Sequence, residues 1–180
     1  MFELRMEIIE TLDGQKEGWD AFLHHWAQQG ERLLDVAMDD DPEATVKAID
    51  TFVANPPRKR FSREVDPALS MESLLGGLWG LQLIRKFEWI WTKVTLAEDD
   101  ECVVLGVFPT DRSLAIYPVN SIVACLDHDA PVAIYRSFKL IADGRFANTP
   151  SKRYEDILDT LSYCFPYIDG GIPGTTARRF

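Results

Sequence analysis

The feature that most constrains the fold is an apolar helix expected at residues 70–87. Ser70 can cap its first turn, and leucine and isoleucine then recur at helical spacing around most of its circumference. Such a helix is expected to be buried. It also contains Gly76, Gly77 and Gly80, although glycine in a helix costs about 1 kcal/mol relative to alanine. Because these glycines share one face, we expect another backbone to approach the helix closely there.

Three strand-like runs follow this helix, at residues 89–96, 102–108 and 114–117. The acidic residues 98–101 are expected to connect the first two runs, which pair most simply as antiparallel strands. The sequence therefore predicts a three-stranded meander packed on the central helix.

The chain before this core is expected to be mainly helical. Residues 2–12 fit either a helix or an edge strand. The apolar stripe from residue 16 to about 37 predicts a long amphipathic helix, and Asp41 followed by proline is typical of the start of another. The basic, proline-bounded residues 56–69 are interpreted as an exposed connection.

The last third is also expected to contain helices. Residues 119–126 suit a short helix, and the segment that ends at Gly144 fits a helix, with a strand as the alternative. Thr149 and Pro150 are expected to open a final helix. The sequence thus predicts an α+β fold in which N-terminal helices and a central buried helix pack on a small antiparallel sheet, with C-terminal helices. Residues 1–168 are expected to form one globular domain, and residues 169–180 a mobile tail.

Composition narrows the classes of partner and compartment. The 180 residues include 29 acidic and 19 basic side chains, which give a formal net charge of −10. This balance argues against binding to nucleic acid or to an anionic membrane. The three cysteines lie far apart in apolar segments, and no apolar run approaches the roughly 18 residues that span a bilayer. These features predict a cytoplasmic protein with reduced thiols.

No segment carries a recognisable catalytic, cofactor or metal motif. His24 and His25 are adjacent, so they cannot form the i, i+4 pair that binds a metal on a helix. The glycines of the central helix lack the lysine and the strand-to-helix context of a phosphate-binding loop. A pair of carboxylates acting as acid and base remains an open alternative, because 29 acidic residues allow many spatial pairings.

Two acidic runs are the candidate partner-binding residues. Each is expected to be an exposed loop that could complement a basic partner. The candidates are Asp39, Asp40, Asp41, Glu98, Asp99, Asp100 and Glu101.

The central stretch resembles a family of small, uncharacterised bacterial domains. The resemblance covers residues 70–127 and is based on four features: the glycine-containing run L-G-G-L-W-G-L-Q-L, the W-x-W pair at Trp89 and Trp91, V-x-P at residues 107–109, and Tyr117-Pro118 before a helix. It implies a bacterial cytoplasmic protein and contributes no catalytic residues.

Three functions are compatible with these observations. The leading hypothesis is a non-catalytic protein-binding domain, with an immunity-type protein that neutralises a basic toxin by direct binding as its specific form. The first alternative is an enzyme or small-ligand binder whose pocket, lined by Trp79, Trp89 or Trp91, lies between the sheet and the helices. The second is a homo-oligomeric structural module.

Overall fold

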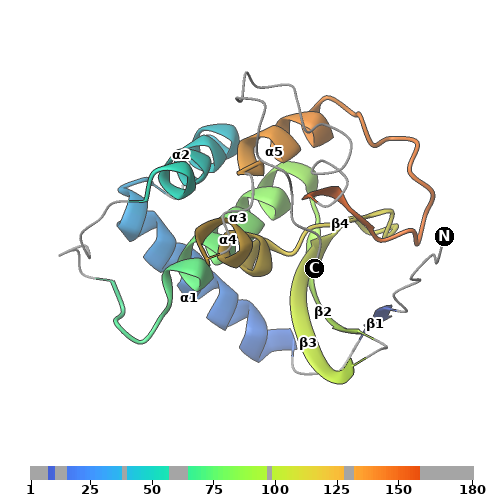
Figure 1. Cartoon of the computed structure of the whole chain (residues 1–180), viewed down its shortest axis with the longest axis horizontal. Helices are drawn as coiled ribbons and strands as arrows, with labels where there is room; N and C mark the ends of the chain where they lie inside the picture. The colour runs from blue at the N-terminus through green and yellow to red at the C-terminus, as the bar shows by residue number, and fades with distance from the viewer. Residues whose placement is uncertain are drawn as a thin grey trace, which may run out of the picture.

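Most of the described secondary structure is helical, and short strands flank one end of the helices (Figure 1). The computed structural model describes residues 8–10, 16–37, 40–56, 65–96, 99–127 and 132–158. Within these ranges it has five helices and two small sheets, which confirms the predicted α+β class. None of the helices in these ranges combines the length and the apolar character needed to cross a bilayer.

The first three helices follow the sequence signals closely. They are α1 (Lys16–Leu34), α2 (Pro42–Ala54) and α3 (Met71–Phe87). The side chain of Ser70 accepts a hydrogen bond from the backbone N–H of Ser73, as expected of the cap of α3. Helix α1 ends slightly earlier than predicted, where Asp35 adopts a left-handed conformation with a φ of 60°.

The main sheet has the order β1-β2-β3 and is antiparallel. Its strands are β1 (Ile8–Glu10), β2 (Ile90–Leu96) and β3 (Asp99–Phe108). The edge-strand alternative for the N-terminal residues is therefore confirmed at Ile8–Glu10. The prediction that residues 99–101 belong to a loop is wrong, because a register shift after Thr95 allows Leu96 to pair with Asp99.

The predicted third strand of the meander belongs mainly to a different sheet. Strand β4 (Leu114–Ala115) pairs in parallel with β5 (Glu155–Asp156). In the described part of the chain, the pairing of this segment with β3 is a single bridge between Ile116 and Val107. The segment cannot continue along β3, because Pro118 lacks an N–H group and begins the next helix.

Two helices follow, α4 (Pro118–Asp127) and α5 (Ile134–Ala142). The helical alternative for the segment before Gly144 is thus confirmed. The helix predicted from Thr149 is wrong at its start, since Lys152 and Tyr154 have positive φ values of 59° and 51° that interrupt a right-handed helix. The rest of that prediction, and the expected tail at residues 169–180, lie outside the described residues.

Helix α3 lies at the centre of the helical part, in contact with α1, α2 and α4 (Figure 1). Its glycines permit these contacts, as predicted. A Cβ atom added at Gly76 would meet the backbone nitrogen of Val119 in α4 at 2.8 Å, and one at Gly77 would meet the Cβ of Trp26 in α1 at 2.6 Å. At Gly80 the neighbour is the indole ring of Trp91 in β2, so the sheet also contacts this helix.

A second apolar cluster is centred on Val94, Phe108 and Ala115, with the rings of Tyr117 and Tyr154 packed against it. Both tyrosine rings lie edge-on to Phe108, at centroid distances of 5.9 and 5.8 Å. The hydroxyl of Tyr117 is buried and has no hydrogen-bond partner among the described residues. Burial, followed by the nearby Asp156 and Tyr154, raises the pKa of Tyr117 to about 12.

Candidate partner-binding site

The two predicted acidic runs lie in different parts of the fold. Asp40 and Asp41 are exposed immediately before α2, whereas residues 99–101 form the beginning of β3. In Figure 1, α2 lies at the upper left and the end of the sheet where β3 begins lies at the bottom, so the structure does not bring them together. Asp39 and Glu98 are outside the described residues.

The carboxylates of Asp40 and Asp41 are held in place by the backbone. Oδ2 of Asp40 accepts a hydrogen bond of 2.8 Å from the N–H of Ala37. Oδ2 of Asp41 accepts one of 3.2 Å from the N–H of Ala44, which makes Asp41 the N-cap of α2. Negative charge is favoured at this end of a helix, because the unsatisfied N–H groups carry partial positive charge. Two exposed carboxylates are therefore oriented before any partner arrives.

The next acidic residue, Glu43, is already occupied by partners within the protein. The hydroxyl of Tyr135 in α5 donates a 2.8 Å hydrogen bond to its Oε1, and the Nζ of Lys139 lies 3.4 Å from the same atom. The bond from Tyr135, with help from Lys139, lowers the pKa of Glu43. The charge of Glu43 is thus balanced by groups in α5. Among the described residues at this end of α2, the exposed acidic side chains are those of Asp40 and Asp41.

The same helix supplies a contact that local sequence patterns do not reveal. Oδ1 of Asp50 accepts a 2.9 Å hydrogen bond from the backbone N–H of Tyr135, in the first turn of α5. The N-cap residue of α5 is Ala133, whose side chain cannot supply a capping bond. Asp50 thus caps α5 from another helix. The sequence signal for this contact was the lack of a capping side chain before α5.

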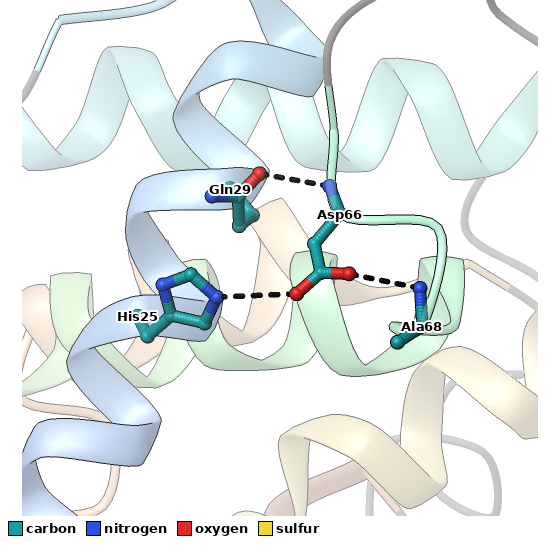
Figure 2. A network of polar contacts seen from close by, with 4 residues as sticks. All are labelled: His25, Gln29, Asp66 and Ala68. Carbon is teal, nitrogen blue, oxygen red and sulfur yellow. Dashed lines mark hydrogen bonds and ion pairs between the residues drawn. The ribbon is translucent and has the colours of Figure 1, made fainter.

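A second polar network joins α1 to the segment before α3 (Figure 2). Nε2 of His25 lies 3.5 Å from Oδ2 of Asp66. The backbone N–H of Asp66 donates to Oε1 of the buried Gln29 at 3.1 Å, and its Oδ1 accepts from the N–H of Ala68 at 2.9 Å. These contacts fasten the chain to α1 just before α3 begins.

This network supports a positioning role better than a catalytic one. The side chains of His25 and Asp66 are 44% and 37% exposed, so solvent weakens their interaction. Within the described ranges, no group of three or more histidine, cysteine or acidic side chains is placed to hold a metal ion. The sequence predicts only that His24 and His25 cannot form an i, i+4 metal pair, and tertiary packing brings the carboxylate of Asp66 to His25.

Two of the tryptophans proposed to line a pocket are core residues. Trp79 and Trp89 are 0% and 5% exposed and belong to the main apolar cluster, whereas Trp91 is partly buried against it. The burial of Trp79 and Trp89 favours a structural role for both.

No protein-family model, curated protein or solved structure matches this chain. The resemblance of residues 70–127 to uncharacterised bacterial domains therefore stays a prediction.

Proposed function

We propose that this protein is a non-catalytic binding protein that recognises a basic protein partner. The observation that carries the proposal is the pair of exposed carboxylates at Asp40 and Asp41, the first held by a backbone N–H in the turn before α2 and the second by a backbone N–H in the first turn of α2. The specific form of the proposal is an immunity-type protein that neutralises a basic toxin by direct binding.

Preorganisation and charge both support this proposal. A side chain that is already fixed loses little conformational entropy when a partner binds. A carboxylate oxygen can then accept charge-assisted hydrogen bonds from lysine or arginine. The formal net charge of −10 would also attract a cationic partner over a longer range and accelerate association at low salt.

Charge-neutral variants can test the proposed site without removing the cap of α2. Asn is as good an N-cap as Asp, so Asp40→Asn combined with Asp41→Asn removes two charges and keeps an acceptor at each position. The matched control is Asp20→Asn with Glu88→Gln, which removes two charges from exposed residues elsewhere. The first partner to examine is the purified product of the neighbouring gene.

Titration calorimetry at low and physiological salt would compare the two double variants. We expect the site variant to weaken binding by about tenfold, equivalent to about 1.4 kcal/mol, and the control to change it much less. Equal losses in both variants would remove Asp40 and Asp41 from the site. If no basic partner binds the wild-type protein, the proposed function itself is wrong.

A further inference from the structure

We infer that the outer edge of β3 receives an extended segment of the basic partner as an added strand. This inference rests on the proposed function and specifies its second contact. Strand β3 is the last strand in the order β1-β2-β3, so β2 pairs with only one of its two edges (Figure 1). An added strand would bind mainly through backbone hydrogen bonds, as in other complexes that extend a sheet.

The hydrogen-bond pattern shows which groups of β3 face outward. Val107 and Ile116 exchange both backbone hydrogen bonds, at 2.8 and 3.1 Å, on the side of β3 away from β2. Backbone groups alternate in direction along an antiparallel strand. Leu105 and Val103 therefore also direct their N–H and C=O groups away from β2, with which β3 pairs in regular register from Val103 to Phe108.

These outward groups have no backbone partner within the described residues. Continuing the pairing of Val107 with Ile116 would place Pro118 opposite Leu105. Pro118 has no N–H and is the first residue of α4, so the chain leaves the edge at this point. Among the described residues, two N–H and two C=O groups, those of Leu105 and Val103, therefore have no strand opposite them.

The sequence of β3 favours a particular occupant. Its first three residues are Asp99, Asp100 and Glu101, and the outward positions that follow are Val103 and Leu105. Acidic residues and register shifts protect many strand edges from nonspecific pairing. Here the acidic residues also favour a partner strand with lysine or arginine at one end, because opposite charges on neighbouring strands attract each other. The apolar residues that follow favour apolar residues along the rest of that strand. In antiparallel pairing, the basic end of the segment is its C-terminal end.

A synthetic peptide can test the edge directly. The probe alternates threonine and valine and ends in three lysines. Two further peptides carry N-methyl groups on alternate residues: one on the odd-numbered residues and the other on the even-numbered residues. Only one of these two peptides therefore loses the N–H groups directed at β3. We expect one methylated peptide to bind about tenfold more weakly or worse, since two backbone hydrogen bonds are lost, and the other to retain affinity. Equal binding of both, or no binding of the unmethylated peptide, would overturn the inference.

Protein variants locate the peptide on β3. Leu105→Pro removes an outward N–H while keeping the hydrogen bonds of its neighbours to β2, and Leu105→Ala is the matched control that keeps the N–H. Peptide binding should be lost in the first variant and retained in the second, with circular dichroism confirming that each is folded. The peptide comparison on wild-type protein remains decisive if Leu105→Pro fails to fold.

The outcomes separate this inference from the proposed function. If a basic partner protein binds the Asp40 and Asp41 variants more weakly but binds Leu105→Pro normally, the proposed function is supported and the added strand is refuted. If light scattering shows wild-type dimers that Leu105→Pro separates, a second copy of the chain occupies the edge and the inference is wrong. Peptide binding that appears only after truncation at residue 168 would assign the edge to the chain's own end and would likewise refute the inference.

Discussion

Replacing Gly30 with alanine should destabilise the protein, although alanine is the better helix former. Gly30 lies where α1 crosses α3, and a Cβ atom there would be 2.5 Å from the carbonyl oxygen of Leu74 and 2.9 Å from the Cβ of Leu78. Ordinary van der Waals contact begins at about 3.4 Å. Because both obstacles belong to the rigid part of α3, the two helices have to separate by several tenths of an ångström or more.

Two opposing effects set the magnitude. Alanine in place of glycine stabilises a helix by up to about 1 kcal/mol. Overpacking in a well-packed core costs about 1–3 kcal/mol. Since the contacts are with backbone and Cβ atoms, we expect the upper part of that range and a net loss of about 2 kcal/mol in the free energy of unfolding. Gly77→Ala should behave similarly, because its Cβ would meet the Cβ of Trp26 at 2.6 Å in the same crossing.

Urea unfolding monitored by circular dichroism measures this effect. Gln28→Ala, at an exposed position of α1, is the control and should change stability by less than about 0.5 kcal/mol. The double variant of Gly30 and Gly77 should lose less than the sum of the single losses, because one separation of the helices relieves both contacts. A Gly30→Ala protein that is more stable than wild type would refute the assigned close approach.

Three further predictions concern polar groups. Asp50→Ala should lower the free energy of unfolding by about 1 kcal/mol and speed exchange of the Tyr135 amide hydrogen. Asp50→Asn keeps a hydrogen-bond acceptor and should have a smaller effect on both. If the two variants have equal effects, measured by urea unfolding and hydrogen exchange, the capping role of Asp50 is contradicted. Because the pKa of Glu43 is lowered in the folded protein, its carboxylate contributes stability that is present above the ordinary carboxyl pKa and is lost as pH falls through the folded-state pKa. Tyr135→Phe should raise the pKa of Glu43 in an NMR titration. An unchanged pKa would contradict the role of the Tyr135 hydrogen bond. Tyr117 should ionise near pH 12, and because its pKa is raised, the folded state should lose stability as pH rises from about 10 to 12. Tyr117→Phe should remove the change in tyrosine absorbance near pH 12. It should not destabilise the protein at pH 7, because the Tyr117 hydroxyl has no hydrogen-bond partner among the described residues.

Local sequence signals predict the start of a helix where a capping side chain precedes an apolar periodic segment, as in α2 and α3. Ser70 caps α3 and Asp41 caps α2 because a short polar side chain before an apolar periodic segment satisfies the first N–H groups. The glycine face of α3 was predictable as a place of close approach, since the cost of glycine in a helix must be offset by packing. Which elements would approach it was not predictable, because that depends on how the helices pack.

Contacts between distant segments account for the errors and omissions. Strand β5 is two residues long and forms on a segment whose Thr149-Pro150 start favoured a helix, so tertiary hydrogen bonds override a local preference there. The acceptor for the α5 cap lies 85 positions from its donor, and Gln29 lies 37 positions from Asp66. The exposure of Asp40 and Asp41 was predicted correctly, but their orientation depends on backbone bonds that form with the turn.

The parallel pair β4–β5 has a consequence for the order of folding. It closes a loop that contains α4 and α5, and the hydroxyl of Ser151 donates to the carbonyl of Asp111 across 40 positions of sequence. Closing a flexible loop of that length costs on the order of 3 kcal/mol in chain entropy. The amides of Lys152, Tyr154 and Glu155, which bond to carbonyls of residues 111–113, should therefore become protected only after α4 and α5 have docked, and they should open together as one cooperative unit.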